Sequence, residues 1–196
     1  MKKIVSIILC VLCFVMLQGC GKNGTQEDGD KLMTVQQILD SAKPSDLICD
    51  KYSLKKYTQP LWNNQIVYNE TVMFIRDSDG NIPEKKLAYP IAKILEVRDS
   101  ALTILYEQDV DYQVTQDGNL KALPGGGIYV TDFDDYYLPQ DKPGGIGALS
   151  KSVQGRFLDY GESDYFYSRQ VCVTYITVTK YSGAKPAFNK DALPKT

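Results

Sequence analysis

The segment Gln170–Thr179 constrains the fold of this chain more than any other part of its sequence. Its ten residues are mostly β-branched or aromatic, and apolar side chains occur on both of the faces that an extended strand presents. A strand that borders solvent alternates apolar and polar residues, whereas a strand that is apolar on both faces is covered on both sides. The sequence therefore predicts a central strand here, buried between two layers.

Most of the remaining sequence also has the pattern of short strands separated by turns. A long run of β-forming residues spans Gln65–Arg76 and ends at the turn signal Asp77–Asn81. Asp117-Gly118 is the signal of a hairpin turn. Further strands are expected at Lys86–Pro90, Ala92–Arg98, Leu102–Tyr106, Tyr112–Thr115 and Leu120–Leu123. Residues Asp132–Ser152 carry prolines, glycines and acids with little periodicity, so we expect surface loops there.

One short helix is expected at Thr34–Lys43, because apolar residues recur there at helical spacing. Thr34 has the position of an N-cap, and Pro44 ends the pattern. Many short strands beside one helix predict an all-β fold over residues 34–196, a jelly-roll-like antiparallel β-sandwich. Residues 20–33 are polar and rich in glycine, and we expect them to form a flexible tether.

The first nineteen residues have the composition of an export signal. Lys2 and Lys3 precede an apolar run from Ile4 to Leu17 that only Ser6 interrupts. A helix that spans a membrane needs about 20 apolar residues, and this run is only fourteen residues long. We therefore interpret residues 1–19 as a signal peptide, with a transmembrane helix as the alternative.

The end of this segment, Leu17-Gln18-Gly19-Cys20, resembles a bacterial lipobox. The resemblance implies that Cys20 is acylated, becomes the first residue of the mature chain and anchors it to the membrane. A single acyl chain binds a membrane only reversibly, and the lipoproteins with this motif carry several chains on that cysteine. The expected location is thus the cell membrane, on its extracytoplasmic face.

Charge and composition argue against several functional classes. Without Lys2 and Lys3, 20 cationic and 24 anionic side chains remain, with no basic run, so a nucleic-acid partner is not expected. The sequence has no histidine, which removes the usual general base and the commonest metal ligand. We expect no cofactor and no metal. We interpret Asp132, Asp134, Asp135 and Asp141 as solvated loop residues, with calcium binding as the alternative.

Cys49 and Cys172 are the two cysteines that follow Cys20. Outside the cell membrane they can form a disulfide, and two buried free thiols are equally compatible with the sequence. Both alternatives stay open at this stage.

Aromatic residues in turn-like surroundings are the candidates for a binding site. Trp62 follows Pro60 and precedes Asn63-Asn64, and the second half of the chain carries Tyr136, Tyr137, Tyr160, Tyr165 and Tyr167. Such rings can stack on sugars while nearby amides and acids bind the hydroxyls. In the alternative interpretation Trp62 closes one end of the sandwich and the tyrosines cover its rim.

Several segments together resemble the N-terminal region of secreted bacterial hydrolases of the SGNH (GDSL) type. These segments are Tyr57–Trp62, Val67–Phe74, Ala88–Ile91, Ile94–Asp99, Asp109–Tyr112, Arg169–Tyr175 and Leu193–Thr196. The resemblance covers about residues 50–196. It implies a β-sandwich that precedes an α/β esterase domain, whose nucleophile lies in a Gly-Asp-Ser block.

The sequence differs from that family at the positions expected to carry catalysis. It contains no Gly-Asp-Ser, and Tyr167 stands where the family leads us to expect a histidine. We therefore expect a non-catalytic accessory module that binds a glycan or docks a separately encoded hydrolase. The alternatives are a fragment of an SGNH-type esterase without its catalytic domain, and a structural envelope lipoprotein without a ligand.

Overall fold

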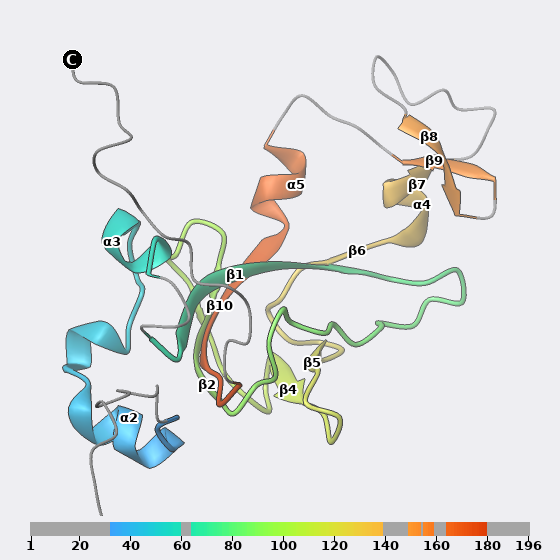
Figure 1. The fold of residues 1–196 in the computed structure, drawn as a ribbon. Helices are drawn as coiled ribbons and strands as arrows, with labels where there is room; N and C mark the ends of the chain where they lie inside the picture. The colour runs from blue at the N-terminus through green and yellow to red at the C-terminus, as the bar shows by residue number, and fades with distance from the viewer. Residues whose placement is uncertain (1–31, 60–63, 139–148, 154, 159–163, 180–196) are drawn as a thin grey trace, which may run out of the picture. The chain divides into compact units, whose positions relative to one another are not determined.

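The computed structural model describes residues 32–59, 64–138, 149–153, 155–158 and 164–179. All of them belong to one unit of the chain, Leu32–Thr196. The described residues form mostly strands with a few short helices, which confirms the prediction of an all-β fold (Figure 1).

A five-stranded sheet is the largest element of the structure, with the strand order β3-β2-β10-β1-β6. Its strands are β1 (Ile66–Ile75), β2 (Lys93–Asp99), β3 (Leu105–Tyr106), β6 (Val130–Thr131) and β10 (Gln170–Ile176). β10 lies in the middle and pairs antiparallel with both β1 and β2. Every side chain from Val171 to Ile176 is buried, so the prediction of a central strand covered on both sides is confirmed.

The edge strand β6 pairs parallel with β1, through Phe74 opposite Val130 and Ile75 opposite Thr131. The sheet is therefore mixed, and the expectation of a wholly antiparallel arrangement is wrong for this pair. A hairpin connection would force an antiparallel pair, but here β2 to β5 lie between the two strands in sequence. The chain thus returns to the sheet after a long crossover, in the same direction as β1.

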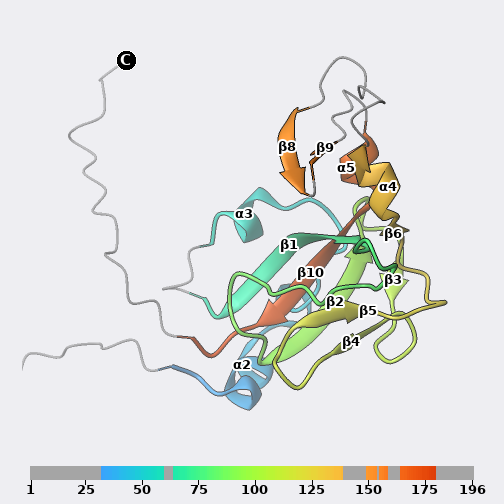
Figure 2. The ribbon, with the colours of Figure 1, turned by 90° about the vertical axis from the view of Figure 1, so that its right-hand side faces the viewer.

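The main hydrophobic core lies between this sheet and a two-stranded hairpin of β4 (Tyr112–Val114) and β5 (Leu120–Ala122). Figure 2 shows the hairpin against one face of the sheet. Its turn contains Gly118 at a φ of 76°, as the Asp117-Gly118 signal predicts. The buried members of this core are Phe74, Leu87, Val97, Tyr112, Leu120, Ala122, Ile128, Val171, Val173 and Tyr175.

The N-terminal segment covers part of the opposite face of the sheet. Its helix α2 (Val35–Ser41) begins at Thr34, whose side chain and that of Gln37 form a capping box, so the predicted helix is confirmed. Two shorter turns follow, η1 (Pro44–Asp46) and α3 (Leu54–Tyr57). Ile38 of α2 packs on Ile66 and Ile176 in a second, smaller core. Within the described ranges no helix has the length and hydrophobicity of a membrane span, and the apolar run at residues 4–17 lies outside them.

Lys86–Pro90 does not form the strand that the sequence predicts. The backbone N–H of Ala88 donates to the Glu70 carboxylate at 2.7 Å, and that of Tyr89 donates to the Tyr175 hydroxyl at 3.2 Å. Because side chains of the sheet satisfy these donors, the segment does not need a neighbouring strand. The predicted strand at Leu102–Tyr106 is shorter than expected, because Leu102 has a φ of 63° and belongs to a turn after β2.

The described parts of Asp132–Ser152 form regular elements in place of the predicted surface loops, and residues 139–148 lie outside the described residues. These elements are α4 (Phe133–Tyr136), β7 (Tyr137–Leu138) and the greater part of β8 (Leu149–Val153). β7 and β8 flank β9 (Arg156–Leu158) in a small sheet of their own. A further short helix, α5 (Tyr165–Ser168), directly precedes β10.

Candidate functional site

The structure brings together three of the tyrosines that the sequence singles out. Tyr136 ends α4, Tyr137 begins β7 and Tyr165 begins α5. Trp62 and Tyr160, the other predicted ligand-binding residues, and Cys20, the predicted lipidation site, lie outside the described residues. Tyr167, which the sequence also points to, lies in the same helix as Tyr165.

Aromatic contacts hold the two short helices α4 and α5 in place. The ring centroid of Tyr136 lies 4.8 Å from that of Tyr137 and 5.7 Å from that of Phe166. Phe166 also packs edge-on against Tyr165, at 5.1 Å. Four-residue helices are unstable alone, so these ring contacts between distant parts of the chain account for them. We call the set Tyr129, Phe133, Tyr136, Tyr137, Tyr165, Phe166 and Tyr167, together with Arg169, the tyrosine–arginine cluster.

Arg169 lies at the end of α5, between two tyrosine rings. Its guanidinium carbon is 3.5 Å from the ring centroid of Tyr165 and 4.9 Å from that of Tyr129. Both contacts are cation–π interactions, which hold the guanidinium group and the rings in fixed relative positions. Burial acts to lower the pKa of Arg169, but the hydrogen bond to Tyr129, the phenols of Tyr165 and Tyr129, and the carboxylate of Asp135 raise it overall. The side chain is therefore a permanent cation.

Tyr129 reaches the cluster because the strand around it alternates. Ile128 and Val130 pack in the main core, so Tyr129 and Thr131 point to the other face of the sheet. Thr131 is fully buried there. Its hydroxyl and the Nε of Arg169 are the buried side-chain polar atoms that lack a hydrogen-bond partner among the described residues.

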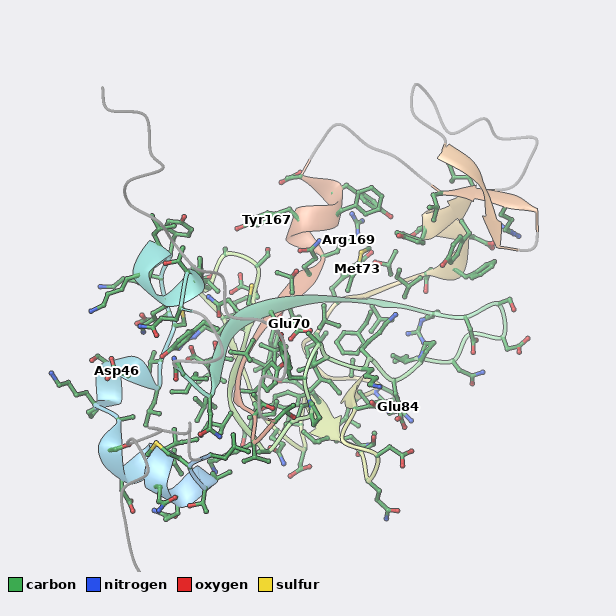
Figure 3. The ribbon with its side chains drawn as sticks, viewed as in Figure 1. Asp46, Glu70, Met73, Glu84, Tyr167 and Arg169 are labelled. Carbon is green, nitrogen blue, oxygen red and sulfur yellow. The ribbon has the colours of Figure 1, made fainter. Side chains whose placement is uncertain are left out.

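Two tyrosines of the cluster present much of their rings to solvent. Tyr129 is 48% exposed and Tyr167 is 59% exposed. The Tyr167 hydroxyl donates to the backbone carbonyl of Ser100 at 2.8 Å, which anchors the ring at its polar end. Figure 3 shows Tyr167 and Arg169 at the end of α5, on the same side of β1 as Met73. Contacts within the protein therefore hold both exposed tyrosines in position.

Two of the acidic residues beside the cluster form ion pairs. Asp132 binds Arg76 at 3.1 Å, and Asp134 binds Arg156 at 2.7 Å. Among the described residues no group of three or more acidic or cysteine side chains is arranged to hold a metal ion. Asp141, the fourth acid of the predicted loop, lies outside the described residues.

The Tyr136 phenol and the thiols of Cys172 and Cys49 stay in their neutral forms near neutral pH, because burial raises the pKa of each. Burial raises the pKa of Tyr136, with a smaller contribution from Tyr137. Burial also raises the pKa of the Cys172 thiol to about 11 and, to a lesser extent, the pKa of Cys49. Both cysteines are buried and free. A neutral phenol interacts with other groups by ring stacking and hydrogen bonds. A protonated thiol is a poor nucleophile.

Sequence reasoning missed Tyr129 and Arg169. The available signal for Arg169 is its position directly after the aromatic run Tyr165-Phe166-Tyr167-Ser168. The signal for Tyr129 is the alternation from Ile128 to Thr131, which leaves an aromatic residue on the face opposite the core.

Comparisons of the chain with protein-family models, with curated proteins and with solved structures find no match.

Proposed function

We propose that this protein is a non-catalytic glycan-binding module, carried on the extracytoplasmic face of the cell membrane by a lipid on Cys20. One observation supports glycan binding more than any other: Tyr129 and Tyr167 are each about half exposed, and contacts within the protein hold both. The membrane location rests on the lipobox-like sequence Leu17-Gln18-Gly19-Cys20.

Fixed, exposed tyrosines suit a sugar ligand for two physical reasons. The apolar body of a tyrosine ring stacks on the C–H face of a sugar ring, and its hydroxyl bonds at the edge. A ring that is already held loses little conformational entropy on binding, which improves affinity. Arg169 holds Tyr129, and the Ser100 carbonyl holds Tyr167.

We further propose that the five-stranded sheet and the β4–β5 hairpin are the two layers of a jelly-roll-like sandwich. This arrangement would be similar to the accessory region that precedes SGNH-type esterase domains. The buried core between sheet and hairpin supports a two-layer fold. The function of such a module would be to keep a hydrolase near its polysaccharide, either by binding the glycan or by docking the enzyme.

Affinity electrophoresis of the purified protein in gels that contain xylan, mannan or pectin fragments tests glycan binding. We expect at least one polysaccharide to retard the protein, and Tyr167→Ala to weaken that retardation by about 10-fold or more. Tyr52→Ala is the matched control, because Tyr52 is a 72% exposed tyrosine outside the cluster. Equal loss in both variants, or no retardation of the wild-type protein by any polysaccharide, would contradict the proposal.

An esterase assay with p-nitrophenyl acetate tests the non-catalytic part of the proposal. We expect no turnover above the buffer blank from this chain. Turnover that a serine-directed fluorophosphonate probe abolishes would instead identify the chain as an enzyme.

A further inference from the structure

We propose that Arg169 binds the carboxylate of an acidic sugar, so that the ligand of the tyrosine–arginine cluster is a glycan that contains uronic acid. This inference rests on the proposed glycan-binding function and names its ligand class. The argument comes from the charge state of Arg169, its free hydrogen-bond donors and its position beside Tyr129.

Arg169 differs from the other arginines of the chain in having no anionic partner among the described residues. The sequence contains four arginines. Arg76, Arg98 and Arg156 each form an ion pair with a carboxylate, at 3.1, 2.9 and 2.7 Å respectively. Arg169 contacts two tyrosine rings instead. Its charge is thus stabilised by ring faces but not neutralised by a protein carboxylate in the described part of the chain.

The guanidinium group of Arg169 also retains hydrogen-bond donors. Nη1 donates to the carbonyl of Tyr165 at 3.4 Å, and Nη2 donates to the hydroxyl of Tyr129 at 3.5 Å. Both bonds are long, and both acceptors are uncharged, so both are weak. Each terminal nitrogen carries a second N–H. A guanidinium group binds a carboxylate through two parallel N–H donors, which makes arginine better suited than lysine to this task.

The described acidic residues near Arg169 do not neutralise its positive charge by an ion pair. Asp132 and Asp134 are already paired with Arg76 and Arg156. Asp135 and Asp164 are the remaining carboxylates of α4 and of the residue before α5. Neither forms an ion pair with Arg169, although the charge of Asp135 is close enough to act on it. Asp135 and Asp164 oppose an approaching anion, but neither neutralises the guanidinium group.

Tyr129 joins the two parts of the proposed site. Its hydroxyl lies 3.5 Å from Nη2 of Arg169, and the residue is 48% exposed. A pyranose ring stacked on the free face of Tyr129 would therefore have a cationic group near the hydroxyl end of the tyrosine. Neutral hexoses carry a hydroxymethyl group on ring carbon C5, whereas uronic acids carry a carboxylate there. The cluster thus combines a stacking surface with a cation at the position where these two sugar classes differ.

Carboxyl reduction gives a direct test, because it changes each uronate to the neutral sugar and leaves the backbone of the polysaccharide intact. The probes are polygalacturonate, alginate and glucuronoxylan, each compared with its carboxyl-reduced form by affinity electrophoresis and calorimetry. We expect the wild-type protein to bind at least one acidic polymer about 10-fold more tightly than its reduced form.

Arg169→Gln should abolish the difference in affinity between each acidic polymer and its reduced form, and loss of the contact with Tyr129 should weaken the binding of both. Arg169→Lys should retain part of the difference. Arg76→Gln is the matched control, because Arg76 is already paired with Asp132, and it should keep the full preference. Circular dichroism and the melting temperature confirm that each variant is folded. If Arg169→Gln does not fold, the Arg169→Lys variant carries the comparison.

The outcomes separate this inference from the proposed function. Equal binding of acidic and reduced polymers would overturn the role of Arg169 and leave glycan binding intact. Equally tight binding of dextran sulfate would show a general attraction of anions and would also overturn the inference. Binding of none of the acidic, reduced or neutral polymers would overturn the proposed function itself.

Discussion

The buried carboxylate of Glu96 accepts a hydrogen bond from the backbone N–H of Cys49. Glu96 lies on β2 and is only 6% exposed, whereas Cys49 belongs to the N-terminal segment. The second carboxylate oxygen of Glu96 binds Nε of Arg98 at 2.9 Å. One side chain thus joins the N-terminal segment to the sheet and neutralises a largely buried arginine.

Replacement of Glu96 by alanine should destabilise the protein strongly. The change leaves the guanidinium group of Arg98 without its counter-ion and the Cys49 N–H without its acceptor. Loss of one partner of a buried ion pair costs about 3–5 kcal/mol of unfolding free energy. Urea denaturation measures the effect. The exposed Glu107→Ala is the control and should change stability by less than about 0.5 kcal/mol. Equal stability of the two variants would show that Glu96 does not hold the segment.

Asn69 should stabilise the folded protein through both its backbone conformation and its side-chain hydrogen bonds. Its φ of 49° lies in the left-handed region, at an irregularity in the pairing of β1 with β10. Its Nδ2 donates to the Tyr57 hydroxyl at 2.8 Å and to Cys49 Sγ at 3.2 Å. We expect Asn69→Gly to lose the side-chain bonds alone, at a cost of about 1–2 kcal/mol.

Asn69→Ala should be less stable than Asn69→Gly by about 1 kcal/mol, because the Cβ of alanine is strained in the left-handed backbone conformation. This order reverses the usual preference for alanine over glycine in a strand. Chemical denaturation of the two variants checks it. If alanine proves the more stable, the backbone at this position is not restrained to a positive φ.

The parts of the fold that the sequence predicted are those in which local pattern and tertiary contacts agree. Gln170–Thr179 is apolar on both faces, and the burial of β10 on both sides follows directly. Thr34 and Gln37 cap the helix α2 by contacts within four residues. Asp117-Gly118 specifies its hairpin turn in the same local way.

The parts that the sequence did not predict depend on contacts between distant residues. Lys86–Pro90 has a strand-like composition, but Glu70 and Tyr175 satisfy its backbone donors. The helices α4 and α5 are too short to show a periodic pattern, and contacts such as that of Tyr136 with Phe166 hold them. The contact of Arg169 with Tyr129 joins residues that are far apart in sequence, so no local pattern predicts it.

Replacement of Cys20 by alanine should abolish lipid attachment. The proposed lipid anchor requires acylation of Cys20, and no other cysteine follows a matching Leu-x-Gly pattern. Metabolic labelling with an alkyne fatty acid, followed by membrane fractionation, measures the effect. Cys13→Ala is the control, since Cys13 lies within the predicted signal peptide and should not alter labelling. Persistent labelling of the Cys20→Ala chain would contradict the assignment.

Alkaline pH should destabilise the protein through the buried Cys172 thiol. Burial raises the pKa of this thiol from 9.0 in the unfolded chain to about 11 in the folded protein. Between these two values the unfolded state has released the proton and the folded state still binds it. Stability is therefore complete below pH 9 and falls as the pH rises from 9 towards 11, by about 2–3 kcal/mol. Urea denaturation at pH 8, 9, 10 and 11 follows this loss.

The variant Cys172→Ala distinguishes the contribution of the thiol to the pH dependence of stability from that of the buried tyrosines. Burial raises the pKa of Tyr112 to about 12, so its contribution is lost at a higher pH than that of Cys172. We expect Cys172→Ala to be less stable at pH 8, because it leaves a cavity, but to lose less stability between pH 9 and 10. An unchanged pH profile would show that Cys172 does not titrate in this range. A wild-type mass lower by two hydrogen atoms before reduction would identify the reason as a disulfide with Cys49.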